Sequence, residues 1–143
     1  MKTIALRFSD NFAPECGTIA AHEEIIQKYG YVWYGKLGNR VSDVMIQTIM
    51  ETDDPKILLI HSGKTGRYWA HISKAQNEQP NLDEVPSYYR DMAGNFKSWF
   101  CVTRFEKAQK DILSKCTVIT SGALLSNASR HSMSPYFRIE TEA

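Results

Sequence analysis

The chain has 143 residues, of which 43% are hydrophobic and 23% charged, and its formal net charge is +1. This length suits one domain with a buried core, and the balance of apolar and charged residues argues against disorder. No apolar run approaches the roughly 20 residues that span a bilayer, and the segment Met1 to Phe8 lacks the apolar core of a signal peptide. We therefore expect a single domain over residues 1–143, a cytoplasmic location, no membrane partner and no large non-specific nucleic-acid footprint.

The three cysteines, Cys16, Cys101 and Cys116, are widely spaced. No CxxC pair and no Cys/His cluster has the spacing of a zinc site, so we expect neither a metal site nor a cofactor. Cys101 stands between Phe100 and Val102 in a strand-like run, which is typical of an inert buried thiol.

The first half of the chain predicts strand, helix, strand and helix, over residues 3–8, 18–29, 31–34 and 42–51. Thr18 is the expected N-cap of the first helix, and Gly30 stands just past its end. A polar turn with Pro14 closes the first strand, and Pro55 follows the second helix. The helix residues expected to face the core are Ile19, Ile25, Ile26, Tyr29, Val44, Met45, Ile49 and Met50.

The second half predicts strands over residues 56–61, 67–72, 96–105, 117–119 and 136–139. The first two surround the short turn Gly63 to Gly66 and predict a hairpin. Residues 76–95 read as a long polar loop, which in a compact domain is often functional. Residues 106–115 predict a helical turn and residues 121–134 a polar segment. About six meandering strands with interspersed helices predict an α+β fold, a curved mixed sheet or open barrel with two or three helices packed around it.

The common catalytic signatures are missing, since there is no GxGxxG, Walker loop, GxSxG or HExxH. The four histidines fall on different predicted elements, with no spacing that implies a shared metal. His71 alternates with apolar residues, which favours a surface or satisfied-core role. His61 ends a predicted buried strand beside Ser62, which is a better position for a site residue. The sequence therefore favours a non-catalytic binding domain over an enzyme.

Aromatic residues carry a stronger signal. Trp33 ends a predicted strand beside a glycine-rich turn, and Tyr88, Tyr89 and Met92 fall in the long polar loop. Aromatic faces stack on nucleobases at about 1–3 kcal/mol per base, and a methylated base adds apolar surface to bury. The pattern at Trp33 equally fits a core residue. Basic residues that flank predicted turns, and that would contact phosphate there, are Arg7, Lys36, Arg40, Lys64, Arg67, Lys97 and Arg130.

Taken in order, these segments resemble the YTH and EVE branches of the PUA-like superfamily over most of the chain. Arg7 to Asn11 is similar to the exit of the first YTH strand, and Val32 to Lys36 to the family's tryptophan-containing strand. Lys56 to Lys74 resembles the central hairpin. Phe96 to Cys101 resembles the Phe-Lys-x-x-Trp-Ile strand, one residue shorter, and Ser126 to His131 falls where the family has a phosphate-contacting segment.

The resemblance implies a PUA-like fold that binds DNA or RNA by holding a modified base in an aromatic pocket. Trp33 and one of the loop tyrosines would form the walls, and Asp10 would accept from an exocyclic amine of adenine or cytosine derivatives. The second wall lacks a tryptophan and the YTH C-terminal helix is missing, so the chain is more similar to EVE domains, which often accompany a nuclease or other effector. The implied base-binding residues are Ser9, Asp10, Asn11, Trp33, Tyr34, His61, Tyr88, Tyr89 and Met92, and the implied phosphate-binding residues are Arg7, Lys36, Arg40 and Arg130.

Two other classes stay open. One is an ASCH-type nuclease or hydrolase, with His61 and residues 121–131 as its site. The other is a small-ligand module, in which the same aromatic pocket holds a nucleotide-like metabolite or a peptide.

Overall fold

The computed structural model describes residues 1–63 and 66–142. One mixed sheet of seven strands runs through these residues in the order β2-β5-β4-β3-β1-β7-β6. β1 and β3 pair in parallel, and every other neighbouring pair is antiparallel. The strands are β1 (Lys2–Phe8), β2 (Val32–Leu37), β3 (Lys56–His61), β4 (Arg67–Gln76), β5 (Phe96–Lys107), β6 (Cys116–Val118) and β7 (Tyr136–Thr141).

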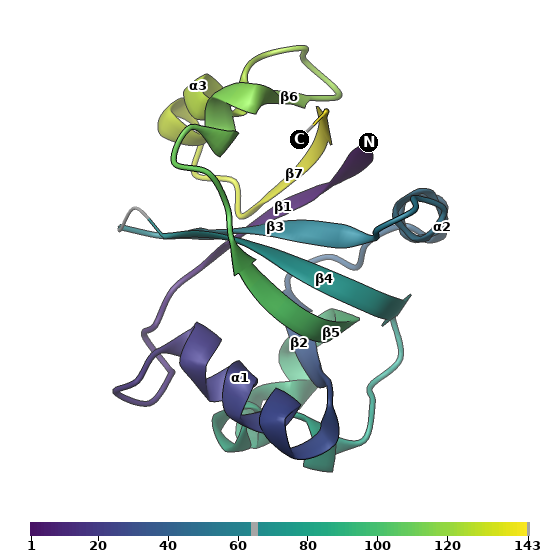
Figure 1. Cartoon of the computed structure of the whole chain (residues 1–143), viewed down its shortest axis with the longest axis vertical. Coiled ribbons are helices and arrows are strands. Elements are labelled where there is room, and N and C mark those ends of the chain that lie inside the picture. Colours follow the sequence, from purple (N-terminus) through teal and green to yellow (C-terminus); the bar gives the residue numbers. More distant parts are fainter. Residues whose placement is uncertain (64–65, 143) are drawn as a thin grey trace.

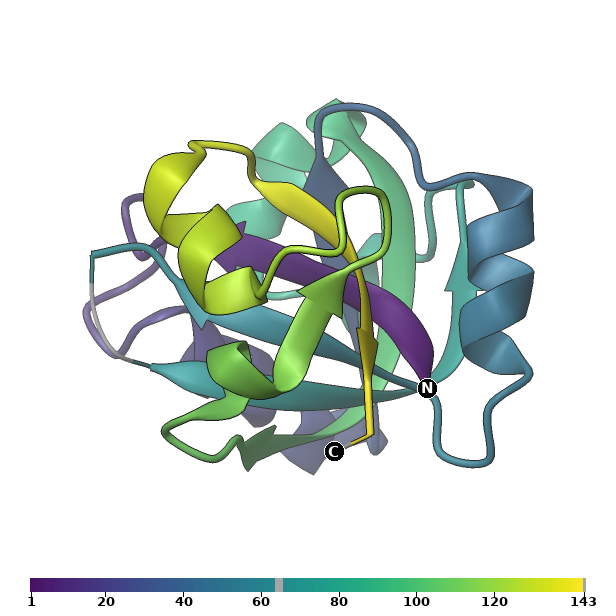
Figure 2. The same cartoon turned by 90° about the horizontal axis from the view of Figure 1, so that it is seen from above.

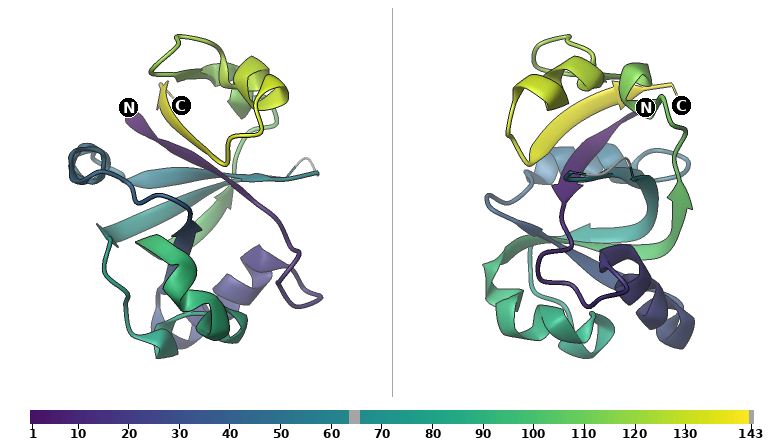
Figure 3. Two further views of the ribbon diagram at one scale, coloured as in Figure 1. Left: turned by 180° about the vertical axis from the view of Figure 1, so that it is seen from behind. Right: turned by 90° about the vertical axis from the view of Figure 1, so that its left-hand side faces the viewer.

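Helices cover the two ends and one side of this sheet (Figures 1 and 2). They are α1 (Thr18–Tyr29), α2 (Asp43–Met50) and α3 (Leu125–His131), with 3-10 helices η1 (Leu82–Glu84), η2 (Ser87–Asn95) and η3 (Ile112–Lys115). α1 lies on the side of β2 and β5, α3 lies with β6 at the opposite end, and α2 stands apart from both. The side view in Figure 3 shows the strands curling around the interior. Among the helices of the described residues, none is long and apolar enough to cross a membrane.

The predicted α+β fold with a curved mixed sheet is confirmed, with seven strands in place of about six. The hairpin of β3 and β4 forms as expected, and residues 64 and 65 of the predicted turn lie outside the described residues. α3 lies in the segment expected to be merely polar, and η1 and η2 lie in the expected irregular loop. α3 has only seven residues, and tertiary contacts support it. The Leu125 side chain is fully buried and the Arg7 guanidinium donates to the backbone carbonyls of Ser129 and Ser132.

Two helix residues expected in the core are exposed. Val44 is 75% exposed because it lies on the opposite side of α2 from Met45 and Ile49, which are buried four positions apart, and from Ile46 and Met50, which pack beside them. Tyr29 is exposed in the last turn of α1, where the Lys28 ammonium lies over its ring. The buried residues of α1 are Thr18, Ala21 and His22, and the predicted core residues Ile19, Ile25 and Ile26 are half-buried against the largest cluster.

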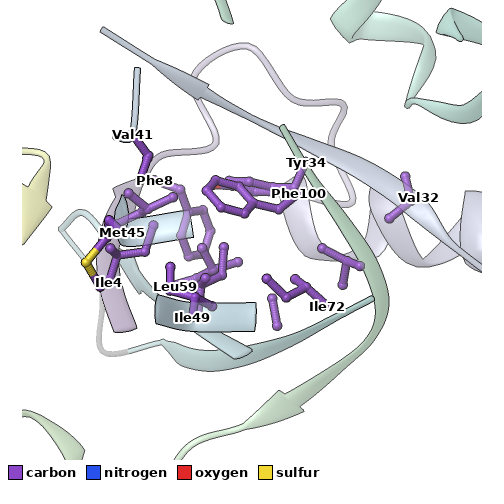
Figure 4. Close-up of a cluster of buried hydrophobic side chains, with 14 residues drawn as sticks. Ile4, Phe8, Val32, Tyr34, Val41, Met45, Ile49, Leu59, Ile72 and Phe100 are labelled. Carbon is purple, nitrogen blue, oxygen red and sulfur yellow. The ribbon is translucent and has the colours of Figure 1, made fainter. Parts of the chain in front are cut away.

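Three buried clusters make up the interior. The largest lies on the sheet face toward α1 and α2, and Figure 4 shows its members Phe8, Tyr34 and Phe100. The second includes Ile112 and Leu125 and lies under η3, β6 and α3. The third lies between the β2–β5 pair and η1–η2, and contains Trp33, Val85, Tyr89, Ala93, Phe96, Trp99 and Cys101. The candidate site lies where the first and third clusters meet.

Candidate functional site

A cavity of about 570 Å³ opens where the ends of β1 and β2 meet η2. The loop between β1 and α1 contributes Phe12 to its lining, and the loop before β7 contributes Met133. This volume falls within the range of about 300–1,000 Å³ that is usual for small-ligand sites. Phe12 is 72% exposed and Met133 94% exposed, so the rim of the cavity is apolar and open to solvent.

Aromatic side chains make up much of the wall. Those that line the cavity are Phe8, Phe12, Tyr34, Tyr88, Tyr89 and Phe96. Tyr89 organises one side, because its ring centroid is 5.0 Å from that of Tyr88 and 4.5 Å from that of Phe96. Phe96 in turn lies so close to Gly35 that a Cβ there would be 2.5 Å from a ring carbon. Glycine at position 35 thus allows the Phe96 ring to lie against β2.

His22 supports the wall from behind. Its ring centroid is 5.1 Å from Tyr34 and 4.9 Å from Tyr89, and its Nδ1–H donates to the carbonyl of Thr18 at 2.8 Å. Burial lowers the pKa of His22 to about 4, so the ring is neutral, and its buried Nε2 has no partner among the described residues. Burial also raises the pKa of the Tyr34 and Tyr89 hydroxyls, which therefore stay protonated.

Trp33 does not belong to this wall, which corrects the expectation from the sequence. The residue is only 6% exposed, it is a member of the third buried cluster, and its Nε1–H donates to Glu84 at 3.2 Å. It is not among the described residues that line the cavity. The physical reason is what covers the ring: Val85, Tyr89 and Ala93 from η2 and the segment before it pack against Trp33 in the third cluster.

Asp10 and His61 hold the loop between β1 and α1 in place. Neither is among the described residues that line the cavity. The Asp10 carboxylate accepts from the backbone N–H of Thr18 at 2.9 Å and contacts His61 Nε2 at 2.6 Å. The other ring nitrogen, Nδ1, donates to the carbonyl of Ser62 at 2.8 Å. Partial burial acts to raise the pKa of Asp10, but the bonds from His61 and Thr18 lower it to about 2. The expected roles of Asp10 in reading an amine, and of His61 in base binding or hydrolysis, therefore have no support in this geometry.

The expected phosphate contacts separate into two groups. Arg40 pairs with Asp43 at 3.6 Å on the surface and Arg130 is exposed on α3, and neither is among the described residues of the lining. The same holds for Asn11, which is exposed. Arg7 and Lys36 do line the cavity. Of the other expected base-binding residues, Ser9, Tyr34, Tyr88, Tyr89 and Met92 line it as well.

Several lining residues were not predicted as site residues from the sequence. Phe12, Leu37, Phe96 and Met133 come from four separate segments, and only the fold brings them together. Gly35 gave the one local signal, since a glycine inside a strand often marks a close approach by another group. A glycine in a strand predicts that another group packs closely there, but it does not predict that this group is the Phe96 ring.

A second hollow of about 880 Å³ lies against the Trp69 side of β3 and β4. Its charged lining mixes both signs: Lys56, Lys107, Lys115, Glu106, Glu140 and Glu142. Trp69 is its one aromatic residue among those described, and Lys56 covers that ring at 4.7 Å. Although it is larger, this hollow offers a planar ligand no open aromatic face.

The remaining chemistry-bearing residues have structural roles. His71 is buried between Asp54 and Glu106, at 2.9 and 2.8 Å, which confirms a satisfied-core histidine. Cys101 is buried as predicted, and burial raises the pKa of its thiol. Within residues 1–63 and 66–142 there is no group of three or more His, Cys, Asp or Glu side chains arranged to hold a metal ion.

A curved mixed sheet with an aromatic-lined cavity of about 570 Å³ at one end of its strands places the chain in the class of small α+β domains with a ligand-sized pocket. The Pua-like family model matches residues 4–137, and the chain therefore belongs to the Pua-like family. This membership indicates nucleic-acid binding as the broad class of function. Searches for similar curated proteins and for similar solved structures gave no match.

Proposed function

We propose that this domain binds nucleic acid by accepting one unstacked base into the 570 Å³ cavity, and that it prefers a base with an added apolar substituent. The observation that carries the proposal is a hollow bordered by tyrosine and phenylalanine rings in a chain of the Pua-like family. Clustered rings normally close on one another at native packing density. Here the tyrosine and phenylalanine rings leave enough space between them for the planar ring of a base.

Tyr88 is the best candidate for a stacking partner. It is half-buried at the cavity, and its edge-on contact with Tyr89 supports the ring from one side. Stacking of about 1–3 kcal/mol per base offsets part of the few kcal/mol that unstacking costs. Exposed Phe12 at the rim adds apolar surface for a neighbouring base.

A substituted base is favoured because the wall is mostly apolar. Met92 and Phe96 line the cavity near Tyr89, and a methionine adapts its shape to an irregular ligand. Each buried methyl or methylene group contributes about 0.8 kcal/mol. We infer an EVE- or YTH-type reader on the resemblance of the segments and on this wall, and a nuclease or other effector partner on the resemblance alone.

The test is binding to a panel of DNA and RNA oligonucleotides, plain and base-methylated, single- and double-stranded, at two salt concentrations. We expect the tightest binding for a methylated, unpaired base. Salt dependence should be shallow, with a slope of about −0.7 per phosphate contacted by a cation, because Arg7 and Lys36 are the charged residues of the described lining.

Variants separate the cavity from the rest of the surface. Tyr88→Ala should weaken binding about tenfold or more, as the loss of one stacked base requires. Tyr29→Ala is the matched control, because Tyr29 is exposed and outside the described lining. Phe12→Ala tests the rim without touching the core. Equal binding by wild type, Tyr88→Ala and Phe12→Ala would show that the nucleic acid binds elsewhere.

A further inference from the structure

The charges around the cavity have one sign. Among the described residues that line it, the charged side chains are Arg7 and Lys36, and there is no carboxylate and no side-chain amide. The nearby carboxylate of Asp10 is turned to Thr18 and His61. The second hollow, in contrast, carries lysines and glutamates in equal number. A ligand in the aromatic cavity therefore meets two cationic side chains in the wall, while the Asp10 carboxylate, whose charge acts on Tyr34 and Tyr88, is not among the described residues that line it.

Lys36 is the more informative of the two cations. It is 8% exposed, and its ammonium donates to the carbonyls of Leu37 at 3.1 Å and Asn39 at 2.7 Å. The Tyr136 ring centroid lies 4.8 Å from Nζ. No carboxylate of the described residues lies within ion-pair distance, and burial lowers the pKa of Lys36. An ammonium has three N–H donors, so one remains after the two carbonyl bonds.

Arg7 contributes charge but is already engaged as an anchor. Its Nε donates to the carbonyl of Ser134 at 3.0 Å, and one Nη donates to the carbonyls of Ser129 and Ser132. These bonds tie the segment between α3 and β7 to β1. Two of the five guanidinium donors remain, but these bonds and the Phe137 ring, 5.9 Å from the guanidinium carbon, hold Arg7 toward the segment before β7. Lys36, whose two bonds are local to the end of β2, is therefore the cation that we assign to the ligand.

The hydroxyl groups of the wall do not reverse this polarity. Burial raises the pKa of Tyr34, Tyr88 and Tyr89, so these side chains stay neutral at physiological pH. The Thr18 hydroxyl donates to the carbonyl of Ser9 at 3.1 Å. An exocyclic carbonyl oxygen is attracted to the ammonium, whereas an exocyclic amine facing it is repelled.

We propose that the cavity selects a heterocycle by an oxygen-acceptor edge, of the kind that guanine, hypoxanthine and uracil present, and that Lys36 is the residue that reads this edge. The inference rests on the proposed function and specifies its ligand class. It reverses the preference for an amine-bearing base that the position of Asp10 in the sequence suggested. The added apolar substituent would then lie against Tyr88 and Met92, away from the edge that Lys36 reads.

The test uses pairs of single-stranded oligonucleotides that differ at one position, hypoxanthine against adenine and uracil against cytosine. Each pair exchanges one exocyclic amine for one carbonyl oxygen and the adjacent ring-nitrogen acceptor for an N–H, and leaves the ring size unchanged. We expect the oxygen-bearing member to bind at least about tenfold tighter, as a hydrogen bond to a charged group implies. Lys36→Met, which keeps the length and apolar character of the stem, should abolish the difference, chiefly by weakening the binding of the oxygen-bearing member.

Lys28→Met is the matched control, because Lys28 is exposed on α1 and outside the described lining, and it should keep the full preference. Lys36→Gln, which retains a neutral donor, should keep part of it. Circular dichroism of each variant checks that it is folded. If oligonucleotides bind but the pairs bind equally, or the amine-bearing member binds tighter, the inference is wrong and the proposed function stands. If the preference survives in Lys36→Met, another group reads the edge and the inference is also wrong.

Competition with inorganic phosphate tests whether Lys36 binds a phosphate group instead of the base. If phosphate displaces the base in wild type but not in Lys36→Met, the ammonium holds a phosphate group and the inference is wrong. If phosphate displaces nothing beyond a general salt effect, the acceptor edge remains as the partner of Lys36. If no oligonucleotide of any kind binds, the proposed function and the inference fail together.

Discussion

The side chains of two neighbouring residues of β2 lie in different surroundings. Trp33 faces the third buried cluster, where η1 and η2 cover it and Glu84 accepts from its indole. Tyr34, one position later, faces the other side of the strand and borders the open cavity. Both rings are buried, but the strand is covered over at Trp33, whereas a hollow remains beside Tyr34. The difference shows that aromatic content does not mark a binding site, because what packs over a ring decides whether it is core or wall.

The largest effect should come from the filled side. Trp33→Ala should lower the free energy of unfolding by about 3–5 kcal/mol, because it removes a large buried ring and leaves a void. Chemical denaturation measures this value, and Trp33→Phe, which keeps most of the ring, should lose much less. A loss below about 1 kcal/mol together with a selective loss of oligonucleotide binding would instead restore Trp33 as a wall of the site.

Gly35→Ala tests the contact between the two sides. A Cβ at position 35 would lie 2.5 Å from a carbon of the Phe96 ring, so the ring must move. We expect a loss of about 1–3 kcal/mol of stability, typical of overpacking, and weaker oligonucleotide binding because Phe96 lines the cavity. Gly94→Ala is the matched control, since nothing lies within 4 Å of a Cβ there. Equal stability of the two variants would contradict the close approach.

The sequence predicted the strands and the first two helices because their signals are local. Runs of β-branched and aromatic residues, glycine at a helix end and prolines at breaks act over a few positions. The site depends on distant partners instead. Asp10 and His61 are 51 positions apart, and Arg7 reaches carbonyls more than 120 positions away. No local pattern contains these contacts, so Asp10, His61 and Arg7 were given roles in ligand binding rather than in holding the loops of the site.

Asp10→Asn probes how the open side is held in place. The pKa of Asp10 is lowered from 3.8 to about 2, so its charge stabilises the fold above about pH 4, and this contribution is lost as the pH falls through about 2. Because the carboxylate is about one-third exposed, solvent screening reduces the expected difference at neutral pH to about 1 kcal/mol. Denaturation of both proteins across this pH range measures it. A difference that does not shrink in acid would exclude the charge as its cause.

The smallest change in stability is expected at Lys36, and its sign separates a ligand-binding lysine from a structural one. Burial lowers the pKa of Lys36 in the folded chain, so the charged form costs stability below that folded value, and the cost is relieved as the pH rises toward 10.5. Lys36→Met removes the cost, while the carbonyls of Leu37 and Asn39, on exposed residues, regain water. At about pH 7 the variant should be equally stable or up to about 1 kcal/mol more stable than wild type, and the difference should shrink in alkali. A clear loss of stability in denaturation would mean that the ammonium stabilises the end of β2. Unchanged or increased stability, together with a lost preference for the oxygen-bearing base, is the result expected of a residue that binds the ligand.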